Sequence, residues 1–105
     1  SMEVALENFS KLKKASKVVI LGDMFELGEQ SAIEHQAIVN LADAMPFSQT
    51  LYVGEHFYKT STQNKRFRNF EALEAYLIEN TLENQSVLIK GSRGMQLERV
   101  LEFLN

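Results

Sequence analysis

Short apolar runs alternate along this chain with segments whose apolar residues recur every three or four positions. The runs at residues 17–21, 49–53, 65–67 and 86–89 have the length and composition of strands. Strands that alternate with helices form a parallel sheet with right-handed crossovers. The pattern therefore predicts an α/β fold, a three-layer Rossmann-like domain with a mainly parallel sheet and helices on both faces.

Helical spacing predicts the segments between these strands. The first helix should end near Lys13 and Lys14, because cations suit a helix C-terminus. Its inward face is predicted to be Met2, Ala5, Leu6, Phe9 and Leu12. After the last strand, a final helix should turn inward Met95, Leu97, Val100, Leu101 and Leu104.

The second helix is predicted to begin at Ser31, in an S-x-x-E capping box with Glu34, and to end at Pro46. Its inner face should consist of Ile33, Ala37, Ile38 and Leu41. A short helical turn through Tyr58 is expected after the second strand, followed by a surface loop at 59–64. Asn69 is predicted to cap a further helix whose inward residues are Leu73, Tyr76 and Leu77.

Composition narrows the class of protein. A chain of 105 residues, 45% hydrophobic and 24% charged, is expected to be one soluble globular domain with one core. Its net charge of -3, with no clustered basic face, argues against nucleic acid as a main partner. The absence of cysteine excludes disulfides and thiolate chemistry. With no apolar run near 18 residues and no signal peptide pattern, we expect a cytoplasmic protein without membrane insertion.

A basic loop follows the last strand and contains Lys90, Gly91, Ser92 and Arg93. The carboxyl end of a parallel strand and the amino end of the next helix meet where N–H groups favour an anion. Arg93 could grip a carboxylate or phosphate through two parallel hydrogen bonds, while Ser92 could donate to it or cap the helix. The alternative is that the flanking glycines only turn the chain and both cations are solvated.

A second polar loop follows the first strand, so two loops, one acidic and one basic, should share one edge of the sheet. Asp23 is either a turn residue bonded to its own backbone or a ligand contact, and Glu26 is either a contact or a solvated carboxylate. Met24 is either an apolar contact or locally packed. His35 either stabilises the preceding loop through hydrogen bonds or contacts a ligand. With two histidines and no cysteine, we expect no metal site.

Together these loops resemble a known family. Residues 21–28 read LGDMFELG, His35 follows them, and residues 87–93 read VLIKGSR. This combination resembles the C-terminal domain of UDP-N-acetylmuramoyl-tripeptide:D-alanyl-D-alanine ligases, the MurF members of the Mur ligase family. The resemblance covers nearly the whole chain. It implies that residues 1–105 are a single Mur ligase C-terminal domain, a fragment of a larger three-domain enzyme of peptidoglycan synthesis.

The resemblance also implies which ligands each domain of the enzyme binds. The family's ATP-dependent amide ligase adds D-alanyl-D-alanine to UDP-N-acetylmuramoyl-tripeptide, and its ATP and Mg²⁺ are bound mainly by a central domain. No G-x-x-x-x-G-K-[ST] loop occurs here, so we expect the fragment alone to be inactive. By resemblance, Lys90, Gly91, Ser92 and Arg93 hold the dipeptide carboxylate. Asp23 and Glu26 lie across the same cleft near the amine or nucleotide, and His35 and Met24 are candidate contacts.

In the family, a strand with an Asp-x-Tyr-Asn-Ala-Asn-Pro signature precedes the first helix. The resemblance therefore implies that the fragment lacks the first strand of its domain. An open sheet edge would follow, and weak self-association through that edge is one expectation.

Two other classes of protein remain as alternatives. A receiver-like module would match Asp23 and Lys90, but it needs an aspartate after a middle strand, where this chain has Gly54 and Glu55. A stand-alone nucleotide-binding or protein-interaction module lacks a G-x-G-x-x-G motif after either early strand.

Overall fold

The computed structural model describes residues 1–104. In this part of the chain, parallel strands form one sheet in the order β3-β2-β1-β4. The strands are β1 (Lys17–Gly22), β2 (Gln49–Val53), β3 (Lys65–Phe67) and β4 (Ser86–Lys90). β1 pairs with both β2 and β4, so Val19 lies opposite Thr50 on one side and Leu88 on the other. The predicted parallel sheet is confirmed.

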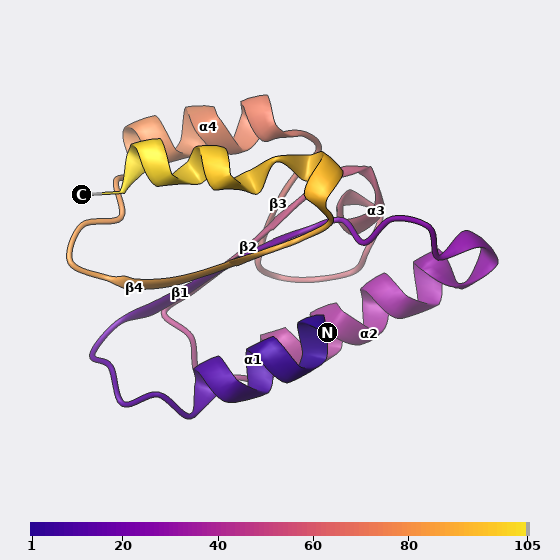
Figure 1. Ribbon diagram of the computed structural model, residues 1–105, viewed down its shortest axis with the longest axis horizontal. Coiled ribbons are helices and arrows are strands. Elements are labelled where there is room, and N and C mark those ends of the chain that lie inside the picture. Colours follow the sequence, from indigo (N-terminus) through magenta and orange to yellow (C-terminus); the bar gives the residue numbers. More distant parts are fainter. Residues whose placement is uncertain (105) are drawn as a thin grey trace.

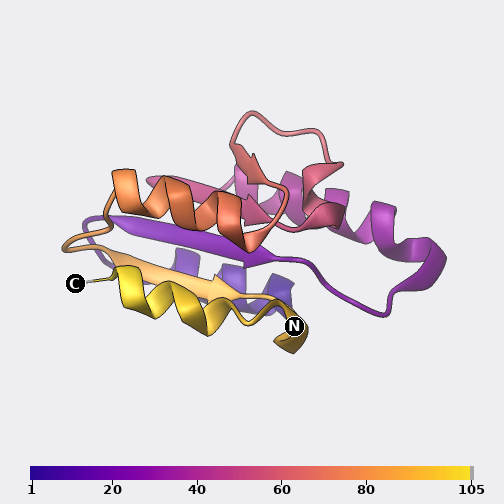
Figure 2. The same ribbon diagram turned by 90° about the horizontal axis from the view of Figure 1, so that it is seen from above.

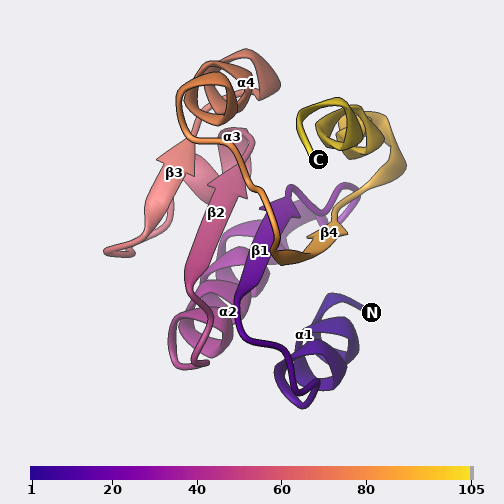
Figure 3. The same cartoon turned by 90° about the vertical axis from the view of Figure 1, so that its left-hand side faces the viewer.

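Helices cover both faces of the sheet, which confirms the three-layer prediction (Figures 1 and 3). One face carries α1 (Met2–Ser10) and α2 (Ser31–Asp43). The other carries α4 (Phe70–Glu79) and the 3-10 helix η3 (Leu97–Phe103), which lie side by side in Figure 2. The short α3 (Glu55–Tyr58) follows β2 directly. None of the described helices is long and apolar enough to cross a membrane.

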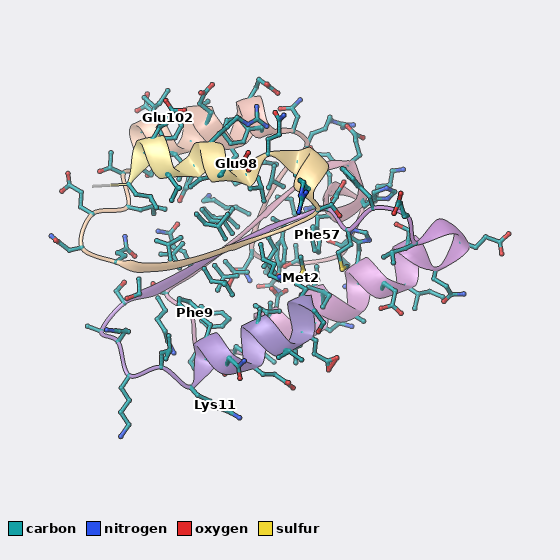
Figure 4. The ribbon with its side chains drawn as sticks, in the orientation of Figure 1. Met2, Phe9, Lys11, Phe57, Glu98 and Glu102 are labelled. Atoms are coloured by element: carbon teal, nitrogen blue, oxygen red, sulfur yellow. The ribbon has the colours of Figure 1, made fainter. Side chains whose placement is uncertain are left out.

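The central strand β1 is buried along its whole length because both of its faces are covered. Val19 and Leu21 belong to the core cluster shared with α1 and α2, while Val18 and Ile20 belong to the cluster shared with α4 and η3. In Figure 4 the side chain of Phe9 lies between α1 and the sheet. Burying each such aliphatic side chain contributes about 1.5–3 kcal/mol.

α1 ends earlier than predicted, at Ser10, and Leu12 beyond it is exposed. The expected role of Lys13 and Lys14 at its C-terminus is wrong. The ammonium group of Lys17, at the start of β1, instead donates to the carbonyls of Phe9, Ser10 and Leu12 at 3.1, 2.8 and 3.0 Å. Lys17 satisfies these carbonyls from outside the helix, which lets the chain turn directly into β1.

The predicted capping box at the start of α2 is also wrong. A 3-10 turn, η1 (Gly28–Gln30), leads into the helix, and no side chain caps it. The Ser31 hydroxyl lies 3.1 Å from Nδ1 of His56 and 3.3 Å from Nδ1 of His35. Ser31 therefore connects two helices instead of closing the end of one.

The inner face of α2 differs from the prediction. Ile33 is 63% exposed and Ala37 is exposed too, whereas Ile38 is buried as predicted and Leu41 is half-buried. The face that meets the sheet consists of Ser31, His35, Ile38, Val39 and Ala42. A polar residue takes an inward position here because its ring nitrogens find hydrogen-bond partners.

The final helix is wound as two 3-10 segments, η2 (Arg93–Met95) and η3, separated by Gln96 in the left-handed conformation with φ 51°. A 3-10 helix has three residues per turn, so Leu97 and Val100 stack on the buried side. Leu101 follows one position later and is 59% exposed, although it was predicted to face inward.

Several local predictions are confirmed. The side chain of Asn69 accepts from the amide of Ala72 and caps α4, in which Leu73 and Leu77 are buried. β4 lies at an edge of the described sheet, where residues 86–89 are half-buried and Lys90 is exposed. The further strand and the self-association expected at an open edge stay predictions.

Candidate functional site

The segments that follow β1 and β4 lie side by side at the carboxyl edge of the sheet (Figure 1). The amide of Ser92 donates to the carbonyl of Asp23 at 2.9 Å. The Ser92 Oγ accepts from the amide of Phe25 at 2.8 Å. These bonds confirm that the acidic and the basic loop meet, through one bond between backbone groups and one bond to the Ser92 hydroxyl.

The basic loop presents its cations to solvent. Lys90 and Arg93 are exposed, and neither forms an ion pair within residues 1–104. Together with Gly91 and Ser92 they line a cavity of about 370 Å³, whose apolar wall includes Leu97. The cavity therefore combines two cations and a hydroxyl with apolar surface and one carboxylate, Glu98. Its cations outnumber its acid, and the two cations and the hydroxyl are groups that suit a small anionic ligand.

Gly91 has a structural role beside the cations. A Cβ on Gly91 would lie 3.0 Å from the Cα of Gly22 at the end of β1. The absence of a side chain therefore allows the ends of β1 and β4 to approach closely. Ser92 does not cap η2 with its side chain, which leaves its hydroxyl for the contact with Phe25.

Asp23 is almost completely buried, with 3% of its surface exposed. Its Oδ2 accepts from the amide of His56 at 2.9 Å, and its Oδ1 accepts from the amide of Phe57 at 3.0 Å. Asp23, which follows β1, therefore holds the amino end of α3, which follows β2. This role differs from both alternatives given for Asp23, a turn residue bonded to its own backbone and a ligand contact. Its partners lie more than thirty residues away along the chain, so no local pattern could have indicated them.

Asp23 also lines a second cavity, of about 420 Å³, whose lining includes Phe25, His56, Arg68, Gly94 and Arg99. The 91–94 segment contributes to both cavities, with Gly94 in this one and the preceding three residues in the first. Asp23 and the basic groups therefore line adjacent cavities, and their sharing of one ligand stays a prediction. Glu26 is exposed with φ 64° and lines neither cavity.

His35 is fully buried beneath the acidic loop. Its Nε2 accepts from the amide of Met24 at 3.0 Å, and its Nδ1 lies 2.7 Å from the carbonyl of Ser31. The hydrogen bonds favour the reading in which His35 stabilises the preceding loop. Met24 is half-buried against the core on the α1 and α2 side. Direct contact of either residue with a ligand stays a prediction.

Three cavity residues carried no signal in the sequence. The His56 ring stacks on that of His35 with centroids 5.0 Å apart. The guanidinium of Arg99 lies 3.9 Å from the centroid of the Phe70 ring, and Arg68 Nη1 lies 3.5 Å from Glu55 Oε2. Arg68 lies between β3 and α4, whereas Arg99 lies in η3, so only the tertiary fold brings the two cations together. Within residues 1–104, no group of three or more His, Asp or Glu side chains could hold a metal ion.

Comparison with known proteins shows what the chain is similar to. UDP-N-acetylmuramoyl-tripeptide–D-alanyl-D-alanine ligases match the chain: that of Treponema pallidum is 36% identical and covers 99% of it. The enzyme of Buchnera aphidicola is 34% identical over 84% of the chain, and that of Escherichia coli is 30% identical over 99%. Over nearly its whole length, the chain is similar to one part of the MurF ligases.

The chain covers 20%, 25% and 24% of the length of these MurF ligases from Buchnera, Treponema and Escherichia coli, respectively. No protein-family model matches it. The MurF relationship confirms the resemblance drawn from the two loop motifs, and the rest of a MurF ligase lies outside this sequence.

Proposed function

We propose that the chain is the C-terminal domain of a MurF-type ligase, and that it binds D-alanyl-D-alanine and closes over the nucleotide. The relatives are named for joining this dipeptide to UDP-N-acetylmuramoyl-tripeptide. Within such an enzyme, the contribution of this domain is to position the incoming dipeptide and exclude water. As part of an enzyme that uses a nucleotide-linked precursor, we expect it in the bacterial cytoplasm.

The observation that carries this proposal is the cavity at the end of β4, where Lys90, Ser92 and Arg93 converge. We assign the carboxylate of the dipeptide to this cavity. Arg93 can form two parallel hydrogen bonds with it, Lys90 adds a point charge, and Ser92 can donate from its hydroxyl.

The acidic segment, residues 23–26, is proposed to lie near the opposite end of the ligand. An ammonium group, or the nucleotide, would approach the side on which Asp23 and Glu26 lie, with Met24 as an apolar neighbour. Asp23 lines the second cavity, which supports this assignment for that residue. Its carboxylate already accepts two amide hydrogens, so its charge reaches the ligand from a fixed position.

The bond-forming chemistry belongs to the parent enzyme in this proposal. ATP converts the carboxylate of the tripeptide into an acyl phosphate, and the amine of the dipeptide then forms the amide while phosphate departs. Phosphoryl transfer needs a phosphate-cradling loop and Mg²⁺ ligands, which we assign to the rest of the enzyme. The isolated chain is therefore expected to bind the dipeptide without catalysis.

An amide NMR titration of this chain with D-alanyl-D-alanine tests the proposal, with L-alanyl-L-alanine as the control ligand. A dissociation constant near 1 mM corresponds to roughly 4 kcal/mol of binding free energy. Stereoselective shifts should centre on Gly91, Ser92 and Arg93. Arg93→Gln should weaken binding about tenfold, while Lys13→Gln, which removes an exposed cation outside both cavities, should not.

The absence of any shift with tens of millimolar dipeptide would contradict binding by this domain. Equal shifts with both stereoisomers would show an anion site without the proposed substrate specificity.

A further inference from the structure

The hydrogen bonds of His35 define the protonation of its buried ring. The amide of Met24 donates to Nε2, so Nε2 must carry a lone pair. The short distance of 2.7 Å between Nδ1 and the carbonyl of Ser31 requires a proton on Nδ1. This network assigns the neutral tautomer with its proton on Nδ1, and both ring nitrogens are used.

The next residue of the chain binds a different element. The amide of Met24 reaches α2 through His35, whereas the amide of Phe25 reaches the loop after β4 through Ser92. These two amides belong to consecutive peptide units. A change in the orientation of one displaces the other, so the anchor on His35 also fixes the direction of the Phe25 amide.

The bond from Phe25 determines what the Ser92 hydroxyl can do. The hydroxyl oxygen accepts the amide hydrogen of Phe25 at 2.8 Å. No acceptor for the hydroxyl proton occurs within residues 1–104, and Ser92 lines the cavity that also contains Lys90 and Arg93. Occupation of one lone pair restricts the rotation of the hydroxyl, which leaves it available as a donor toward the cavity.

We propose that His35 is a positioning residue of the ligand site, which acts through the Met24 and Phe25 amides to present the Ser92 hydroxyl as a donor to a carboxylate. The ligand part of this inference rests on the proposed function. His35 itself never touches the ligand in this account, because its ring is fully buried and both its nitrogens are engaged.

The titratable groups that face the ring are Asp23 and His56. Asp23 Oδ1 lies 3.9 Å from Nε2, and it already accepts from the amide of Phe57. On the α3 side, the His56 ring stacks on His35 and the Phe57 ring meets it edge-on at 4.7 Å. A second proton on His35 would oppose the Met24 amide hydrogen, so positioning depends on the neutral ring.

Two variants of similar length separate positioning from packing. His35→Gln retains a carbonyl oxygen that can accept from Met24, whereas His35→Met fills the space without a strong acceptor. In this chain, hydrogen exchange of the Met24 and Phe25 amides reports the loop, and exchange of the Tyr52 amide in β2 reports overall folding. The nitrogen chemical shifts of the His35 ring report the tautomer.

The His35→Met variant should increase exchange at Met24 and Phe25 at least tenfold while Tyr52 stays protected. Binding of D-alanyl-D-alanine should weaken about fivefold, and His35→Gln should recover most of both losses. Ring shifts typical of a proton on Nδ1 are expected in the wild type. Unchanged exchange at the two amides, or a proton on Nε2, would overturn the positioning role.

A loosened loop with undiminished dipeptide binding would overturn the link to Ser92. If the wild-type chain binds no dipeptide at all, the proposed function fails, and with it the ligand part of this inference. The exchange and ring-shift measurements decide the positioning of the loop in either case.

Discussion

The carboxyl group of Asp23 occupies the space that a side chain on Gly54 would need. Gly54 has φ 127°, a conformation that L side chains rarely adopt, and it leads directly into α3. The ends of β1 and β2 can therefore meet through Asp23 only because residue 54 lacks a Cβ.

Replacement of Gly54 by alanine should lower the free energy of unfolding by about 3 kcal/mol, from backbone strain and from overlap with Asp23. Gly28→Ala is the matched control, because Gly28 also has a positive φ, 57°, but a Cβ there meets nothing within 4 Å. The control should lose only about 1 kcal/mol. Urea unfolding measures both, and equal losses would show that the overlap with Asp23 is unimportant.

The two bonds that Asp23 accepts from α3 predict graded effects of its replacement. Asp23→Ala leaves the amides of His56 and Phe57 without their acceptors and should cost roughly 3 kcal/mol. Asp23→Asn retains one carbonyl oxygen and should cost roughly 1 kcal/mol. Thermal unfolding gives the order of the variants. Similar stability of the alanine and asparagine variants would argue against the capping role.

The hydrogen bonds of Lys17 predict a further effect on stability, at the opposite end of the sheet from Asp23. Lys17→Met retains the aliphatic stem but removes the ammonium group that donates to three carbonyls, so it should cost about 2 kcal/mol. The exposed Lys13→Met should stay within about 0.5 kcal/mol of the wild type. Denaturant unfolding at neutral pH distinguishes them, and a neutral Lys17→Met would mean that water replaces the ammonium group at no cost.

Tyr52 predicts a dependence of stability on alkaline pH. Burial, and then the hydrogen bond to Asp43 and the charge of that carboxylate, raise the pKa of Tyr52 well above its ordinary value of about 10. The folded state therefore keeps the phenol protonated while the unfolded chain loses the proton above pH 10. Stability should fall by up to about 1.4 kcal/mol per pH unit above that point.

The Tyr52→Phe variant should lack this component, so its stability should approach that of the wild type as the pH rises from 9 to 11. Unfolding curves at several pH values provide the comparison, with Tyr58→Phe as a control that retains Tyr52. A constant difference between wild type and Tyr52→Phe across this range would show that Tyr52 does not contribute.

The sequence predicted the strands and the parallel topology because hydrophobic periodicity reports burial directly. The bounds of β2 and β3 and the cap at Asn69 came from local patterns. The same reasoning failed for α2, where Ile33 was placed inward. Packing favours the face with His35 instead, because the ring finds partners from the neighbouring loop.

The sequence predicted where on the sheet the site lies, but it did not predict which hydrogen bonds its residues form. Loops after parallel strands must meet at one edge, so the neighbourhood of Asp23 and Ser92 followed from topology. Their bonds run between backbone and side-chain groups of residues far apart along the chain, which no spacing rule encodes.

The position of β4 beside β1 has a consequence for the order of assembly. β1 lies near the start of the chain and β4 near its end, so their pairing closes the largest loop among the strand pairings of the described sheet. A nascent chain that ends before Ser86 can form the β1–β2 pair but leaves β1 with one side unpaired. We therefore expect the ligand site to be the last part of the domain to mature. Pulse-labelling hydrogen exchange should show the amides of β4 gaining protection after those of β2.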